Sequence, residues 1–265
     1  MLEHTFVICA YKESPYLEQC IISLKDQTVK SNIIMVTSTP NLHISSLAEK
    51  YDIPLFINTK EKGIAQDWNF AYAQSRSVFV TIAHQDDVYE KNYLKNIMDY
   101  VKKAKDPIIL FTNYGELRDG KQIITSTLLK IKRLMLWPLK VKILNDKIWV
   151  RRLILRFGNP ICCPSITYNK KKFTDEPFET KFSSNVDWMM LEKASKKTGE
   201  FCYLESICMF HRIHQESTTS EIIGNNLRWK EDYEMFCRFW PRFIAAILVK
   251  IYRLSEKSNN IDKDM

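Results

Sequence analysis

The chain has 265 residues, 45% of them hydrophobic and 12% aromatic, which excludes global disorder and suffices for one large domain with an appendage. Its net charge is +8, and residues 128–157 hold nine basic residues against one acid, so this segment alone carries an excess as large as the whole chain's. The longest apolar run, Phe243 to Val249, is too short to cross a bilayer, and the N-terminus shows no signal-peptide pattern. We therefore expect a cytoplasmic protein. The seven cysteines form no Cys-x-x-Cys pair, which favours reduced thiols.

The first half of the chain alternates strand and helix patterns. Apolar runs rich in β-branched residues predict buried strands at 5–11, 33–36 and 54–57 and from Val78 onward, and a helix pattern follows each of them. Strands joined by helices in this order form a largely parallel sheet with right-handed crossovers. We therefore predict an α/β fold with a Rossmann-type, mostly parallel sheet flanked by helices.

The second half completes this sheet and adds two helical segments. The later sheet-domain elements are strands at 108–112, 165–168, 201–204 and 207–211, a hairpin around Asp119-Gly120 and a helix at 186–196. The basic segment at 128–157 predicts a helical insertion interrupted at Trp137-Pro138, and a long helix at 227–254 has a proline, Pro241, that permits a bend. We divide the chain into a domain at 1–220, which includes the insertion, and a C-terminal helical extension at 221–265.

Two adjacent carboxylates, Asp86 and Asp87, follow the strand that begins at Val78. In open α/β sheets, ligands bind at the carboxyl ends of the strands. Adjacent carboxylates repel each other unless a cation or hydrogen-bond donors offset their charge, so a divalent metal is a natural partner. The alternative is ordinary turn chemistry, because Asp is common in loops and at helix N-caps. Taken alone, the pair favours this alternative.

Five segments in the expected order resemble the inverting family 2 glycosyltransferases of the GT-A fold. They are the strand and Tyr-x-Glu corner at 6–13, the glycine-started helix at 63–69, His84-Gln85-Asp86 in the place of the Asp-x-Asp metal motif, Asn185 to Trp188 in the place of the Glu-Asp signature, and the Arg-x-His-x-x-Ser element at 211–217. Two positions depart from the family pattern. His84 stands where the first metal-motif Asp is expected, and Thr37-Ser38-Thr39 replaces an Asp after the second strand.

The resemblance implies a role for each of these segments. It implies transfer of a sugar from a nucleotide-sugar donor to a lipid-linked glycan acceptor of a bacterial surface polysaccharide, with Asp187 as the catalytic base. Asp86, with His214 and His84, would hold Mg²⁺ or Mn²⁺. The implied donor-binding residues are Ala10, Tyr11, Glu13, Asp67, Asn69, Asp87, Arg212 and Ser217.

Several of these residues have a structural alternative. Asp187 with Ser184 resembles a capping box, and a helix dipole would lower its pKa rather than raise it. For His84, the alternative is a strand-end histidine bonded to the backbone. For Arg212 and His214, the alternative is a pair of solvated polar residues at a strand end. Two other functions also stay open: a metal-dependent nucleotide-sugar hydrolase, and a non-catalytic nucleotide-binding or membrane scaffold.

The basic segment 128–157 predicts a membrane partner. No nucleic-acid-binding motif accompanies it, and its interleaved Leu, Ile, Trp and Arg residues suit an anionic lipid surface. Residues 238–257 repeat this character. The alternative is that the apolar residues pack into the domain core. We expect a peripheral protein on the inner face of the cell membrane that does not bind nucleic acid.

Overall fold

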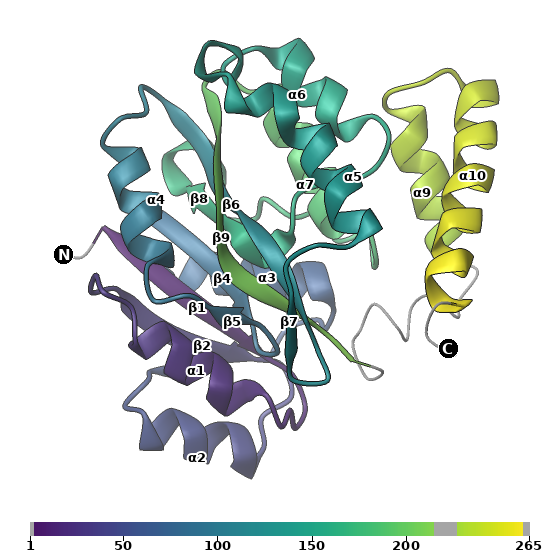
Figure 1. Ribbon diagram of the computed structural model, residues 1–265. Coiled ribbons are helices and arrows are strands. Elements are labelled where there is room, and N and C mark those ends of the chain that lie inside the picture. The colour runs from purple at the N-terminus through teal and green to yellow at the C-terminus, as the bar shows by residue number, and fades with distance from the viewer. Residues whose placement is uncertain (1–2, 215–226, 262–265) are drawn as a thin grey trace.

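The computed structural model describes residues 3–214 and 227–261. A nine-stranded mixed sheet forms its centre (Figure 1). One half consists of four parallel strands in the order β3 (Leu55–Ile57), β2 (Asn32–Thr37), β1 (His4–Ala10) and β4 (Phe79–His84). The predicted α/β fold with a mostly parallel sheet is confirmed.

The other half of the sheet contains the antiparallel strands. Strand β8 (Ile166–Asn169) runs antiparallel to both β4 and β6 (Pro107–Arg118), while β9 (Glu200–Ile213) runs parallel to β6. The short strands β5 (Val88–Tyr89) and β7 (Lys121–Ile123) pair antiparallel with β9 and β6. The sheet thus brings the chain after β4 and the end of β9 to neighbouring positions.

Helices cover both faces of the sheet. Helices α1 (Leu17–Lys25), α2 (Leu42–Lys50) and α4 (Tyr93–Val101) share one hydrophobic cluster with the sheet. A second cluster contains residues of α3 (Ile64–Gln74), α6 (Ile148–Leu155) and α7 (Val186–Ser195). Successive residues of β1 enter different clusters, Phe6 the first and Val7 the second, as the pleat of a strand requires. Short 3₁₀ turns lie at Trp137–Lys140, Lys142–Leu144, Cys163–Ser165 and Lys170–Lys172.

Three predicted elements are corrected by the structure. The strands predicted at 201–204 and 207–211 are one strand, β9, because pairing with the long strand β6 spans both, with a shift of register between Leu204 and Ile207. The helix predicted at 227–254 is two helices, α9 (Leu227–Cys237) and α10 (Arg242–Ile261), which lie side by side (Figure 1). Pro241 separates them because proline lacks an N–H and cannot continue a helix. The hairpin at Asp119-Gly120 is confirmed, with φ of 48° and 76° at its two central residues.

The basic insertion consists of α5 (Thr127–Leu136), two 3₁₀ turns and α6, with the predicted interruption at Trp137-Pro138. Several of its cations stabilise the fold. Arg151 is fully buried and donates to the carbonyls of Lys197 and Gly199, just after α7. Arg152 pairs with Glu192 at 2.8 Å, and the Arg156 guanidinium lies 4.0 Å from a ring centroid of Trp240. Within the described residues, no helix is both long and apolar enough to span a membrane.

Candidate functional site

The carboxyl ends of β1 and β4 form the edge at which the predicted donor residues lie. The two strands are parallel neighbours, with Cys9 opposite His84. The Gln85 side chain accepts from the Tyr11 N–H and donates to the Tyr11 carbonyl, both at 2.9 Å, so it ties the two strand ends together. Tyr11 is 42% exposed and Glu13 is also exposed, whereas Ala10 is buried. Tyr11 and Glu13 are therefore accessible to a ligand.

Asp86 is the partly exposed carboxylate of the acidic pair. Its Oδ1 accepts from the Ser14 hydroxyl at 2.8 Å, and its Oδ2 lies 3.3 Å from His214 Nε2. Ser14 opens the segment before α1, and His214 follows β9, so three distant parts of the chain meet here. A carboxylate with an adjacent imidazole at an accessible strand edge can bind a cation.

Asp87 lies beneath this edge and is fully buried. Its Oδ1 accepts from His211 Nδ1 and from the backbone N–H of Arg212, both at 2.9 Å. Burial alone would raise the pKa of Asp87, but the charge of His211 and these hydrogen bonds hold it below its ordinary value. The same contact raises the pKa of His211 against the opposing effect of burial. Direct donor binding by Asp87 stays a prediction, and its observed contacts fix the end of β9.

Arg212 and His214 are held by aromatic and polar contacts rather than solvated. The Arg212 guanidinium lies 4.1 Å from the Tyr16 ring centroid and donates to the Asp86 carbonyl at 2.8 Å. It also donates to Gln19 Oε1 at 2.6 Å. The His214 ring packs edge-on against Tyr16. The solvated alternative is therefore wrong for both residues. Ser217, predicted as a donor contact, lies outside the described residues.

The structural alternative for His84 required a hydrogen bond between its ring and the backbone, and the described residues contain no such bond. The ring stacks on Trp68 with centroids 5.1 Å apart, and its Nδ1 is 4.0 Å from Asp87 Oδ2. Burial lowers the pKa of His84, so the imidazole is neutral near pH 7. Its Nε2 is buried and has no hydrogen-bond partner among the described residues. A neutral imidazole with an unused nitrogen is chemically suited to a metal ligand.

Helix α3 begins at Gly63 and carries two predicted donor residues. Both oxygens of Asp67 accept hydrogen bonds, from Ser38 Oγ at 2.7 Å and from Asn58 Nδ2 at 2.8 Å. Ser38 belongs to the Thr37-Ser38-Thr39 segment that replaces the family's Asp, and sequence reasoning missed its bond to Asp67. Asn69 is buried, and its amide pairs with the backbone N–H and carbonyl of Phe178. The observed role of Asn69 is thus to hold the segment before α7.

Asp187 lies in the first turn of α7. Its Oδ2 accepts from Asn159 Nδ2 and its Oδ1 from the backbone N–H of Trp188, both at 2.7 Å. Burial raises the pKa of Asp187, and these hydrogen bonds and the charge of Lys132 oppose the rise only in part. The expected lowering by the helix dipole does not prevail. The capping box with Ser184 is also wrong, because the Ser184 hydroxyl donates to Glu231.

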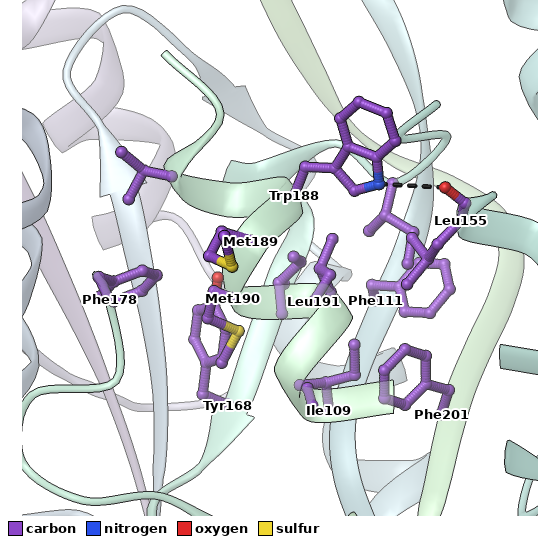
Figure 2. Packing of buried hydrophobic residues seen from close by; sticks show 14 of the residues in the cluster. Ile109, Phe111, Leu155, Tyr168, Phe178, Trp188, Met189, Met190, Leu191 and Phe201 are labelled. Atoms are coloured by element: carbon purple, nitrogen blue, oxygen red, sulfur yellow. Dashed lines mark hydrogen bonds between the residues drawn. The ribbon is translucent and has the colours of Figure 1, made fainter. Parts of the chain in front are cut away.

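The body of α7 is fixed on the sheet by four successive buried residues. Figure 2 shows Trp188, Met189, Met190 and Leu191 among the side chains of the cluster that includes Phe111, Tyr168 and Phe201. The Trp188 indole donates to the Leu155 carbonyl at 3.1 Å, which fixes α7 against α6 as well. Full burial of one large apolar side chain contributes about 1.5–3 kcal/mol. The helix that carries Asp187 is therefore a rigid support.

The carboxylates of Asp87 and Asp187 both lie near Cys162. The buried thiol of Cys162 has its pKa raised by burial, and the charges of Asp87 and Asp187 add to the rise. Cys162 is thus within electrostatic reach of the acidic turn after β4 and of the start of α7. Both segments are therefore neighbours of one buried residue, Cys162.

A metal fits these residues if the substrate completes its coordination. Within residues 3–214 and 227–261, no group of three or more His, Cys, Asp and Glu side chains converges as a metal site. Mg²⁺ is commonly held by one or two carboxylates together with water and substrate phosphates rather than by a protein cage. Asp86, whose Oδ2 lies 3.3 Å from His214 Nε2, offers one carboxylate of this kind. Metal binding at this edge stays a prediction.

Comparison with known proteins identifies the family. The model of glycosyl transferase family 2 matches residues 5–199. No curated protein sequence matches the chain. The solved structure of residues 1–349 of S. aureus TarS with UDP-GlcNAc is similar at a TM-score of 0.67 and 14% identity, over 94% of this chain and 70% of that one. The same fragment with UDP gives a TM-score of 0.61 at 14% identity with equal coverage. The chain therefore belongs to glycosyl transferase family 2.

Proposed function

We propose that the protein is an inverting glycosyltransferase that uses Asp187 as its catalytic base and a lipid-linked glycan as its acceptor. The observation that carries this proposal is the environment of Asp187. A half-buried carboxylate with a raised pKa, held in one orientation by Asn159 and Trp188, is a stronger base than a solvated Asp. Family membership supplies the donor class, because glycosyltransferases of this kind use nucleotide sugars.

The proposed reaction assigns a role to each of these residues. The acceptor hydroxyl attacks the anomeric carbon of the donor from the face opposite the leaving nucleoside diphosphate, so the configuration inverts. Asp187 takes the hydroxyl proton, the new glycosidic bond forms, and the electron pair of the broken bond leaves with the diphosphate. Tyr11 and Glu13, in the exposed segment that follows β1, would contact the nucleoside, and Arg212 holds the acidic turn in place.

A divalent cation would supply charge neutralisation for the leaving diphosphate when bound. Asp86, His214 and His84 would hold it. Similarity to TarS structures that contain UDP-GlcNAc or UDP supports a uridine nucleotide as the first donor to test.

Replacing Asp187 with Asn tests the base. The variant keeps the side-chain size but cannot accept the proton, so we expect turnover to fall by roughly a hundredfold or more with little change in donor affinity. Turnover is measured as UDP release from UDP-GlcNAc with a lipid-linked saccharide fraction, and donor affinity by titration. If the variant unfolds at a lower temperature yet keeps its turnover per folded molecule, Asp187 is a structural residue.

Product analysis separates the alternative functions. A hydrolase releases the free sugar at the same rate with or without the acceptor fraction, whereas a transferase links the sugar to the lipid fraction. A scaffold binds UDP-GlcNAc without turnover. The proposed assignment therefore requires a sugar-linked lipid product that depends on Asp187.

We further propose that the protein works at an anionic membrane surface on the cytoplasmic side. The outer surface of the basic insertion combines four exposed lysines with exposed large apolar residues, among them Leu134 at 73%, Ile143 at 76% and Trp149 at 62% exposure. The lysines are Lys130, Lys140, Lys142 and Lys147. Exposed apolar side chains interleaved with lysines match the chemistry of an anionic lipid interface.

A further inference from the structure

The segment that leads into α7, residues 183–185, is bonded to acidic residues of α9, which lies beyond the end of the family match at residue 199. Glu231 Oε1 accepts from the backbone N–H and the hydroxyl of Ser183, at 2.8 and 2.7 Å. Glu231 Oε2 accepts from the backbone N–H and the hydroxyl of Ser184, at 2.9 and 2.6 Å, and from the Asn185 N–H at 2.9 Å. One carboxylate thus receives five hydrogen bonds from three consecutive residues.

The neighbouring residue of α9 extends this contact. Asp232 is almost fully buried, and its Oδ1 accepts from the Asn185 side-chain amide at 2.7 Å. Asn185 is the N-cap residue of α7, and its side chain makes no capping bond within the helix. Glu231 therefore satisfies the backbone N–H of the N-cap residue, one of the groups that the start of a helix leaves without an intrahelical partner, and Asp232 holds the side chain of that residue.

The position of these bonds connects them to the candidate base. Asp187 is the second residue of α7, so residues 183–185 lead directly into the backbone that carries its carboxylate. Its bond from the Trp188 N–H depends on the same turn. The rest of α7 is held independently by buried residues 188–191 (Figure 2). Loss of the α9 contacts would consequently release the first turn while leaving the helix body seated.

We propose that Glu231 and Asp232 are positioning residues that hold the Asp187 carboxylate in its productive orientation, so that the C-terminal helices form part of the catalytic unit. This inference rests on the proposed role of Asp187. Reacting groups must be placed accurately, and a displacement of about 1 Å can reduce a rate by roughly a hundredfold. Charge-assisted hydrogen bonds of the kind that Glu231 accepts are stronger than neutral ones and fix geometry.

Two substitutions at Glu231 and one matched control test the proposal. Glu231→Ala removes all five acceptor contacts, and Glu231→Gln keeps one acceptor oxygen. Glu234→Ala is the control, because Glu234 also lies on α9 and pairs with Lys181 at 2.6 Å but does not bond the start of α7. For each variant, UDP release from UDP-GlcNAc with the lipid-linked saccharide fraction gives kcat, and titration gives the UDP-GlcNAc dissociation constant.

We expect kcat to fall at least about tenfold in Glu231→Ala, with a smaller fall in Glu231→Gln and none in Glu234→Ala. UDP-GlcNAc affinity should stay within about twofold of the wild type in all three variants, because the donor edge at β1 and β4 is not touched. Amide hydrogen exchange over residues 183–190 should increase in Glu231→Ala only. Assays are run well below the melting temperature of each variant, so that a loss of folded protein does not lower kcat.

Two results overturn the inference. An unchanged kcat in Glu231→Ala, or a loss of kcat and UDP-GlcNAc affinity together, would show that Glu231 supports the fold without orienting Asp187. Asp187→Asn is included to separate this inference from the proposed function. If Asp187→Asn keeps its turnover, the assignment of the base fails; if it loses turnover while Glu231→Ala does not, only the positioning role fails.

Discussion

At the scale of single residues, the adjacent carboxylates Asp86 and Asp87 occupy different environments. Asp87 is fully buried and paired with His211, so its charge is already compensated inside the protein. Asp86 is partly exposed and bonded to Ser14, with one oxygen 3.3 Å from His214. Repulsion between adjacent carboxylates is reduced because their charges are offset by different partners on different sides of the turn.

Replacing Asp86 with Asn removes the negative charge that would attract a cation and keeps an oxygen that can accept from Ser14. We expect metal-dependent binding of UDP-GlcNAc to be lost while the melting temperature changes little. The measurement is a titration of UDP-GlcNAc with and without Mg²⁺ or Mn²⁺, alongside thermal unfolding. Unchanged metal-dependent affinity would rule out Asp86 as a ligand.

Asp87→Asn serves as the matched comparison at the neighbouring position. It weakens the pairing with His211 and the bond to the Arg212 N–H, so it should lower the free energy of unfolding by about 1–3 kcal/mol. The two variants therefore separate ligand binding from fold stability at adjacent positions.

At the scale of elements, strand β1 contains a buried titratable group. His4 Nδ1 lies 2.8 Å from Ser31 Oγ and its Nε2 lies 2.9 Å from Thr81 Oγ1, and burial lowers the pKa of His4 to about 3. The unfolded chain binds a proton at this residue below about pH 6.5, whereas the folded protein does not until about pH 3. The contribution of neutral His4 to the free energy of unfolding is therefore fully present above the unfolded pKa and is lost as the pH falls from about 6.5 toward 3.

His4→Gln keeps a side chain that donates and accepts but does not titrate. Between about pH 7.5 and pH 5.5, the wild type should lose about 1.4 kcal/mol more free energy of unfolding than this variant. Urea unfolding at both pH values measures the difference. Parallel pH dependence of the two proteins would show that folding does not lower the pKa of His4.

The order of most strands and helices could be predicted because hydrophobic periodicity is a local signal. The strands of the parallel half and the hairpin at Asp119-Gly120 lie within a few residues of the expected ranges. Strand β5 has only two residues and depends on pairing with β9, so no local pattern reveals it. The split between α9 and α10 also depends on tertiary packing, since Trp240 donates to the Arg156 carbonyl.

Sequence motifs single out the candidate site residues, but they do not reveal which side chains those residues bond to. Asp86, Asp187 and His214 could be singled out from ordered motifs, and the structure places them at the ends of the expected elements. Their partners come from elsewhere in the chain. The bonds of Glu231 to the segment before α7 join residues 46 to 48 positions apart, and no spacing rule links them.

At the scale of the whole molecule, the basic residues of the insertion form two groups. The arginines hold the fold, and four lysines are exposed at the surface. Arg151, Arg152 and Arg156 support the insertion from within, so replacing them would disturb the fold. The lysines at 130, 140, 142 and 147 are exposed, and α10 adds exposed Phe243, Ile247 and Ile251. A test of membrane binding must therefore change exposed lysines and leave the arginines in place.

We expect the protein to sediment with vesicles rich in anionic phospholipid, much less with vesicles of neutral phospholipid, and to be released by high salt. Each exposed lysine near an anionic surface contributes about 1 kcal/mol, and salt screens this attraction. The variant Lys130→Gln, Lys142→Gln, Lys147→Gln should therefore bind anionic vesicles at least about tenfold more weakly than the wild type. The control Lys25→Gln, Lys30→Gln, Lys50→Gln removes the same charge at and after α1 and at the end of α2, which lie at the opposite end of Figure 1 from α5 and α6, and should bind like the wild type. Equal losses in the two variants would indicate a general charge effect, and equal binding to neutral and anionic vesicles would show that the insertion is a solvated basic surface.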